Sequence, residues 1–94
     1  MTSSVMVISS NNPERVERYD RARLRASVIT ACLSVRTPES QAENTADAVC
    51  DDTERWLQNK SEVTTKDIVT VSAKLLKKYH TEAAYLYEQR HIII

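Results

Sequence analysis

The sequence predicts an α+β fold that is mostly helical: a four-helix bundle capped by a short N-terminal β-hairpin. Three observations predict it. A β-branched segment near the N-terminus is followed by turn residues, apolar residues recur at helical spacing in later segments, and capping residues stand where those segments begin. A chain of 94 residues suffices for one domain. We therefore expect a single domain over residues 1–94.

The hairpin is predicted over about residues 5–19. Residues 4–9 form a short segment rich in β-branched side chains, which favours a strand. Asparagine and proline follow over residues 10–14, and both are typical of turns. In the returning segment we expect Val16 and Tyr19 to face inward.

The helices are predicted over about residues 20–35, 38–58, 65–79 and 81–90. Asp20 is a good N-cap for the first, and Pro38 suits the first turn of the second. Thr64 and Asp67 form a capping box for the third, and Thr81 caps the fourth. Residues 59–62 are expected to form a loop. Residues 91–94 are β-prone, and a further short strand at the hairpin edge is a possible outcome.

The predicted helices each carry apolar residues on one face. In the third helix the expected core face consists of Ile68, Val71, Ser72, Leu75, Leu76 and Tyr79. Cys32 and Cys50 fall on the apolar faces of the first two helices. Since the N-terminus lacks the features of a secretion signal, we expect both to be reduced, buried thiols in a cytoplasmic protein.

Composition excludes several classes of function. Lys plus Arg and Asp plus Glu both number 13, and zero formal charge argues against a protein that coats nucleic acid. No apolar run approaches the roughly 20 residues that span a bilayer. No nucleophile stands in a catalytic motif, and no cysteine–histidine spacing suits a metal, so we expect neither an enzyme nor a metal site. The chain has no glycine, so a nucleotide would be held without a glycine-rich loop.

A cluster of arginines surrounds the start of the first predicted helix. Its members are Arg15, Arg18, Arg21, Arg23 and Arg25. Because the unpaired amides of a helix N-terminus favour anions, these side chains are candidates for holding a phosphate. The alternative is that they form ion pairs with the interleaved carboxylates Glu14, Glu17 and Asp20.

Acidic residues recur every fourth position along the second predicted helix. They are Glu39, Glu43, Asp47 and Asp51, with Asp52 and Glu54 beside them, and no basic residue intervenes. Like charges at this spacing disfavour the helix slightly. The ridge is either a docking face for a basic partner or a solvated helix face.

Three short motifs follow one another in an order that resembles a known family. They are Glu17-Arg-Tyr-Asp-Arg-Ala-Arg-Leu24, Val63-Thr-Thr-Lys-Asp-Ile68 and Glu82-Ala-Ala-Tyr-Leu-Tyr87. Over roughly residues 5–90 the chain resembles the ATP-cone, the regulatory domain of many ribonucleotide reductases and of the repressor of their genes. The resemblance implies ATP or dATP, with its accompanying Mg²⁺, bound between cap and helices, where its identity controls association into oligomers.

The resemblance also implies which residues contact the nucleotide. Val7 would lie along the adenosine, Glu17 and Asp20 would take polar roles, and Leu24, Thr65 and Ile68 would line the base and sugar. Arg23 would replace a phosphate-binding lysine, with Arg21 as a further candidate. The expected site residues are therefore Val7, Glu17, Asp20, Arg21, Arg23, Leu24, Thr65 and Ile68.

One departure from the family pattern keeps a second hypothesis open. The family's first strand ends with a Lys-Arg pair that meets the phosphates, and this chain has Ser9 and Ser10 there. Losing two charge-assisted hydrogen bonds weakens binding by about 10²–10⁴-fold. The alternative function is therefore a degenerate cone that no longer binds nucleotide and serves as a protein-interaction or oligomerisation module. Nucleic-acid binding through the arginines is a third, minor hypothesis.

Overall fold

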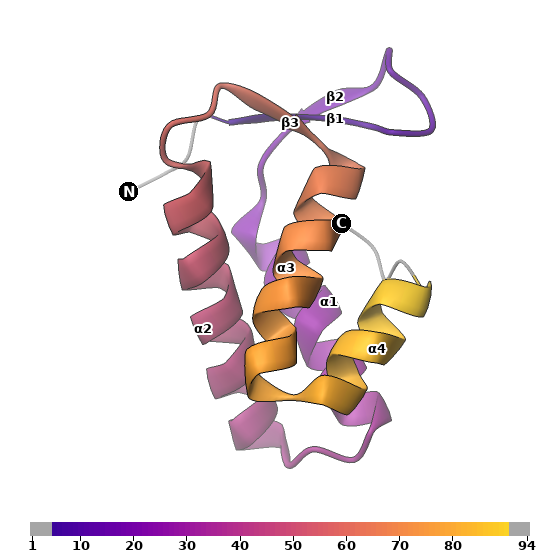
Figure 1. Ribbon diagram of the computed structural model, residues 1–94, viewed down its shortest axis with the longest axis vertical. Coiled ribbons are helices and arrows are strands. Elements are labelled where there is room, and N and C mark those ends of the chain that lie inside the picture. Colours follow the sequence, from indigo (N-terminus) through magenta and orange to yellow (C-terminus); the bar gives the residue numbers. More distant parts are fainter. Residues whose placement is uncertain (1–4, 91–94) are drawn as a thin grey trace.

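A computed structural model describes residues 5–90, apart from the side chain of Arg90. The elements, in chain order, are β1 (Met6–Ile8), β2 (Val16–Arg18), α1 (Arg21–Ser34), α2 (Glu39–Leu57), β3 (Glu62–Thr64), α3 (Thr65–Tyr79) and α4 (Thr81–Arg90). Figure 1 shows the helices side by side, with a small sheet covering one end of the bundle. The predicted fold class, with its hairpin and four helices, is confirmed. The possible strand over residues 91–94 lies outside the described part.

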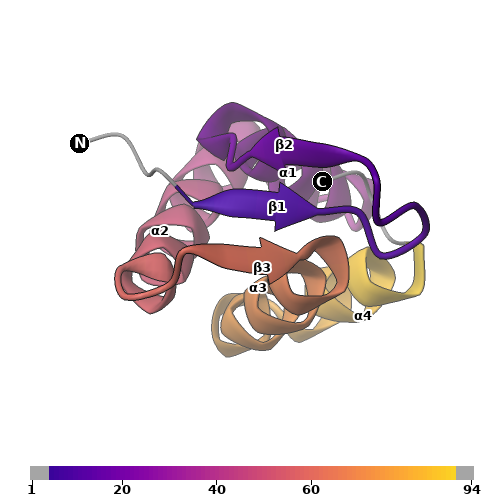
Figure 2. The same cartoon turned by 90° about the horizontal axis from the view of Figure 1, so that it is seen from above.

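The cap is a three-stranded sheet with the order β2-β1-β3 (Figure 2). In its register, Val7 of β1 stands opposite Glu17 of the antiparallel β2 and opposite Val63 of the parallel β3. β3 is an addition to the predicted elements, since residues 59–62 are expected to form a loop. A strand of three residues is too short for an alternating pattern, and its pairing with β1 depends on contacts distant in sequence.

Side chains cap the starts of both helices beneath the sheet. The Asp20 carboxylate accepts hydrogen bonds from the amides of Ala22 and Arg23, at 3.0 and 3.4 Å. Thr64 and Asp67 form the expected capping box at α3. Because these caps fix where α1 and α3 begin, they also fix the helix ends on which the sheet rests.

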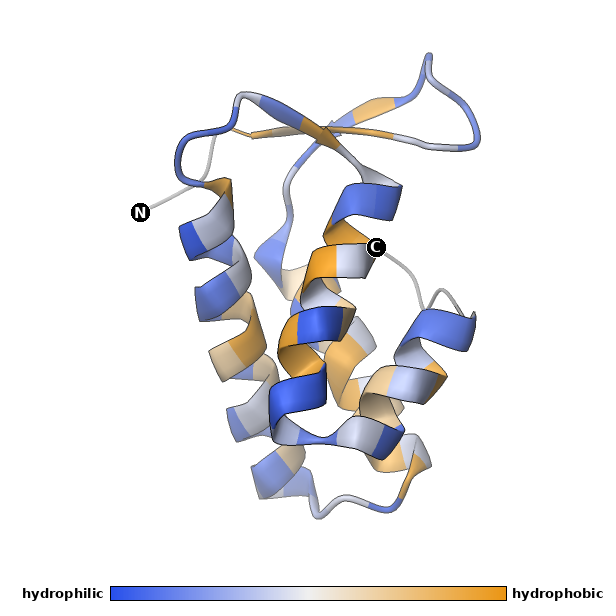
Figure 3. Cartoon of the chain, in the orientation of Figure 1, coloured by the Kyte–Doolittle hydropathy of each residue, from blue (hydrophilic) through white to orange (hydrophobic). Residues whose placement is uncertain are grey.

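The helices pack in a closed ring, with α1 against α2, α2 against α3, α3 against α4, and α4 against α1. The largest fully buried apolar side chains are Leu24, Val28, Val49, Leu57, Ile68, Leu76 and Tyr87. Hydrophobic residues also fill β1, which lies across the helix ends (Figure 3). Both cysteines are buried free thiols, as predicted. Within residues 5–90, no helix is long and apolar enough to cross a membrane.

Two residues expected in the core are exposed. Val16 is 46% exposed because strand alternation turns its neighbour Glu17 toward the helices instead. Tyr79 is 49% exposed at the end of α3, where its hydroxyl donates to Asp52 at 3.1 Å. Tyr19 is buried as expected.

Candidate functional site

A cavity of about 270 Å³ lies between the sheet and the starts of α1 and α3. It is partly open to solvent. Its lining residues are Val7, Ser9, Arg15, Glu17, Arg18, Tyr19, Asp20, Arg23, Thr65 and Ile68. These residues come from β1, the β1–β2 turn, β2, the link to α1, and the first turns of α1 and α3. The cavity is therefore made by the seating of the cap on the two helix starts.

The inner part of the cavity is apolar. Val7, Tyr19 and Ile68 are all buried residues of the hydrophobic core that also reach the cavity wall. Each is held by the fold: Val7 is paired on both sides in the sheet, and Ile68 lies in the first turns of α3. A flat apolar group such as a base could pack against these side chains without displacing them.

The outer part of the cavity carries charge of both signs. The Glu17 carboxylate accepts a hydrogen bond from Nε of Arg15 at 2.9 Å and forms an ion pair with Nη1 of Arg23. The hydrogen bond from Arg23, and then the one from Arg15, lower the pKa of Glu17 below its ordinary range. Arg18 forms no ion pair with any residue that the structure describes. Of the three arginines that line the cavity, Arg18 is thus the one without a carboxylate partner among the described residues.

The amides at the two helix starts are largely occupied by the chain itself. Besides the Asp20 cap of α1, the Ser10 hydroxyl accepts the Lys66 amide at 3.0 Å, and the Thr64 hydroxyl accepts the Asp67 amide at 3.1 Å. The expectation that unpaired amides would contribute to an anion site is therefore not met at these positions. Arginine side chains are the donors that remain for an anion.

Ser10 also ties the β1–β2 turn to α3. Its amide donates to Oγ1 of Thr65, and the Thr65 hydroxyl donates to Oγ of Ser10, both at 3.1 Å. Ser10 thus holds the cap on the helix. Thr65 faces the cavity at the same point.

The structure gathers most of the expected site residues around this cavity. They are Val7, Glu17, Asp20, Arg23, Thr65 and Ile68. Leu24 and Arg21 were also expected at the site, but neither lines the cavity. Leu24 is fully buried among the helices and does not line the cavity. Arg21 lies one residue after the cap, and helical geometry turns it away from the sheet toward α2.

The expected site also omitted four lining residues: Ser9, Arg15, Arg18 and Tyr19. The two arginines belong to the cluster noted in the sequence, but only the strand register reveals which members reach the cavity. Of the predicted arginine partners, only Glu17 forms ion pairs within the described chain. Asp20 serves as a helix cap instead.

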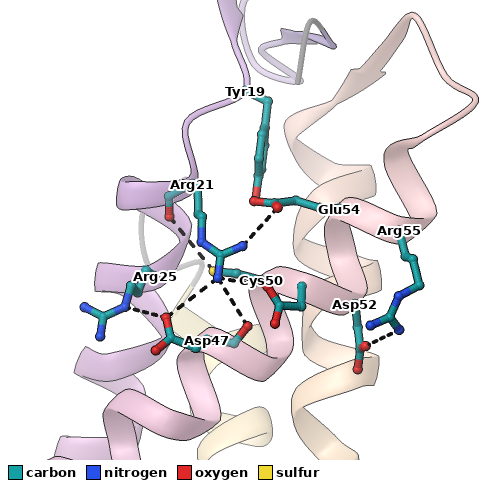
Figure 4. A network of polar contacts seen from close by, with 9 residues as sticks. Tyr19, Arg21, Arg25, Asp47, Cys50, Asp52, Glu54 and Arg55 are labelled. Atoms are coloured by element: carbon teal, nitrogen blue, oxygen red, sulfur yellow. Dashed lines mark hydrogen bonds and ion pairs between the residues drawn. The ribbon is translucent and has the colours of Figure 1, made fainter. Parts of the chain in front are cut away.

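Arg21 and Arg25 bind the acidic ridge of α2 (Figure 4). Arg21 contacts Glu54 at 2.9 Å and Asp51 at 3.0 Å, and Arg25 contacts Asp47 at 2.8 Å. Part of the ridge is therefore used within the protein. We call these ion pairs of Arg21 and Arg25 with Asp47, Asp51 and Glu54 the α1–α2 brace. Glu39 and Glu43 form no ion pair with a described residue.

The Tyr19 hydroxyl reaches the same brace and donates to Glu54 at 3.0 Å. Burial, together with this hydrogen bond, raises the pKa of Tyr19. Since Tyr19 also lines the cavity, one side chain touches both the candidate site and the α1–α2 brace.

Residues 5–90 contain no group of three or more histidine, cysteine or carboxylate side chains arranged to hold a metal ion. Searches against protein-family models, curated proteins and solved structures find no match to this chain.

Proposed function

We propose that this protein is a regulatory module that binds an adenine nucleotide, ATP or dATP, in the cavity beneath the sheet and thereby controls association. The observation that carries the proposal is one cavity with an apolar interior and a rim of three arginines: Arg15, Arg18 and Arg23. The resemblance of the sequence to the ATP-cone supports the same ligand.

The two parts of the cavity suit the two parts of a nucleotide. Its volume of about 270 Å³ lies near the lower end of small-molecule sites, which start at about 300 Å³. We infer that the adenosine packs against Val7 and Ile68, while the phosphates extend to the open rim. There Arg18 and Arg23 bind phosphate oxygens, and Mg²⁺ accompanies the phosphate chain.

Calorimetric titration with ATP, dATP and ADP tests the proposal. Arg18→Gln is the best site variant, because no described carboxylate loses its partner when this guanidinium is removed. Arg55→Gln is the matched control, since Arg55 is exposed on α2 and pairs with Asp52 away from the cavity. We expect saturable binding to the wild type and the control, and binding about 10–100-fold weaker to Arg18→Gln.

The absence of both heat and thermal stabilisation at millimolar nucleotide would contradict the proposal. So would equal affinities for Arg18→Gln and Arg55→Gln, because the ligand would then not contact the rim.

A second candidate function is association between copies without nucleotide. It is favoured by opposite charges on two helices: Glu39 and Glu43 form an acidic flank at the start of α2, and Lys74 and Lys77 lie on α3. None of these four forms an ion pair within the described chain. The lysines line a groove of about 330 Å³ between α3 and α4, next to the exposed ring of Tyr85. We infer that the acidic flank of one copy docks in this groove of the next.

Charge reversal in mixed samples tests this second function. Glu39→Lys/Glu43→Lys and Lys74→Glu/Lys77→Glu should each be monomeric in sedimentation experiments, because each lacks one half of the contact. Mixed together, the two variants should associate again, since the acidic flank of one meets the lysine groove of the other and the two reversed surfaces are also opposite in charge. A monomeric wild type at high concentration, or variants that associate like the wild type, would contradict it.

A further inference from the structure

Glu17 places a carboxylate where the proposed phosphates would bind. Its two oxygens are divided between two guanidinium groups: Oε2 lies 2.9 Å from Nε of Arg15, and Oε1 contacts Nη1 of Arg23. All three residues line the cavity. The backbone of Glu17 is fixed in β2 opposite Val7, so its carboxylate stays near this rim.

We propose that Glu17 is a built-in competitor, whose carboxylate occupies Arg15 and Arg23 and must be exchanged for the phosphates of a ligand. This inference rests on the proposed anion site. It concerns how Glu17 limits the affinity of that site, and which length of phosphate chain has to displace its carboxylate.

The exchange is physically reasonable because the ion pairs lie at the surface. The side chains of Arg15, Arg23 and Glu17 are 64%, 42% and 38% exposed. Ion pairs at this exposure are weak, and a displaced carboxylate can turn into water rather than remain buried without a partner. A phosphate group brings more charge and more acceptor oxygens than a carboxylate, so it competes well for both arginines.

The Glu17 carboxylate is charged, and therefore able to compete with phosphate, at neutral pH. Its neighbouring guanidinium groups hold the pKa of Glu17 below the usual range, so the carboxylate is charged at neutral pH. Arg18, which has no ion pair within the described chain, remains open to the first phosphate. A single phosphate can therefore bind at Arg18 without disturbing Glu17, whereas a longer phosphate chain reaches Arg15 and Arg23 and has to displace it.

Titrations of Glu17→Gln with orthophosphate, tripolyphosphate and ATP test the inference. Glutamine keeps the size of the side chain but removes the charge that holds both arginines. We expect tripolyphosphate and ATP to bind about tenfold more tightly than to the wild type, and orthophosphate to gain less than about threefold. Glu14→Gln is the matched control. Glu14 is an exposed carboxylate in the adjoining turn with no ion pair to a described residue, so its loss changes net charge equally. We expect this control to match the wild type.

A measurement on the unmodified protein gives a second test that does not depend on the variant. Carbon NMR of the Glu17 carboxyl should show a pKa that rises on addition of tripolyphosphate, because the carboxylate leaves Arg15 and Arg23 and meets phosphate charge instead. The other charged groups that line the cavity are Arg18 and Asp20. An unchanged Glu17 pKa in the saturated complex would overturn the inference.

The outcomes separate this inference from the proposed function. If ATP binds the wild type but Glu17→Gln binds it equally or more weakly, Glu17 is not a competitor and the nucleotide site stands. If tripolyphosphate binds and gains affinity in Glu17→Gln while adenine nucleotides show no preference over it, the competitor stands and the adenine assignment fails. If no phosphate compound binds either protein, both are wrong.

Discussion

The guanidinium of Arg21 lies 2.9 Å from the carboxylate of Glu54, and this ion pair joins the first residue of α1 to the last turns of α2. The same carboxylate accepts the hydroxyl of Tyr19 from the cavity wall. An arginine beside a helix start, expected to bind phosphate, is therefore part of the bundle's support. The brace that it forms is connected to the cavity wall through Tyr19.

Substitution of Arg21 should change stability and leave the site intact. Arg21→Gln removes contacts with Glu54 and Asp51, and we expect it to lower the free energy of unfolding by about 1–2 kcal/mol. Nucleotide affinity should stay within about twofold of the wild type, because Arg21 does not line the cavity. Urea unfolding and calorimetry measure the two effects. A large loss of affinity with little loss of stability would contradict the placement of Arg21.

The helices were predictable from the sequence because their signals are local. The capping box of Thr64 and Asp67 and the cap at Asp20 lie beside the segments they start, and both occur as predicted. β3 could not be found in this way, since its pairing with β1 depends on the whole bundle. The inward face of β2 was assigned wrongly at Val16 because three residues give too little alternation to fix a face.

The site was predictable in composition but not in arrangement. The arginine cluster marked the right region, and the resemblance named Arg23 and Thr65, which meet at one cavity. Which arginines face that cavity depends on the strand register and on the helical turn after Asp20. Those features separate Arg15 and Arg23, which meet Glu17 at the cavity, from Arg21, which pairs with Glu54.

The end of α1 offers a test of backbone strain. Arg36 has a φ of 66°, the left-handed conformation that favours glycine, and its amide donates to the Leu33 carbonyl at 3.0 Å. Left-handed geometry costs a residue with a Cβ about 1–2 kcal/mol, and glycine loses about 0.5–1 kcal/mol in added chain entropy. We therefore expect Arg36→Gly to raise the free energy of unfolding by about 0.5–1 kcal/mol. Arg36→Ala should bring no gain, and equal effects of the two variants would argue against strain at this position.

Acid should destabilise the fold through carboxylates paired with arginine. The hydrogen bond from Arg25 lowers the pKa of Asp47, and the one from Arg23 lowers that of Glu17. The unfolded chain therefore takes up protons first as pH falls. The stability contributed by both groups is fully present above the ordinary carboxyl pKa values of about 4 and is lost as pH falls through the lower, folded values.

Urea unfolding at pH 7 and pH 3 measures this loss. Asp47→Asn should be less stable than the wild type at pH 7 and should lose less on acidification, because one of the linked carboxylates is gone. A variant whose stability falls as steeply as the wild type would show that Asp47 is not linked to acid unfolding.

The two cysteines should resist modification in the folded protein. Cys32 and Cys50 are fully buried, and burial raises the pKa of Cys50 to about 12 and also raises that of Cys32. Both thiols are thus protonated and inaccessible at pH 8. A chromogenic disulfide reagent should react with neither thiol in native buffer and with both in guanidinium chloride. Rapid labelling of the native protein would mean that the α1–α2 contact opens readily.

We propose that a nucleotide binds beneath the sheet, between β1 and the starts of α1 and α3. Amide NMR during titration with ATP and Mg²⁺ tests it most directly. We predict saturable shifts concentrated at Val7, Arg18, Arg23, Thr65 and Ile68, while the groove between α3 and α4 around Lys74 stays unchanged. Shifts that never saturate, or that gather at the α3–α4 groove and leave Val7 and Thr65 untouched, would contradict the account.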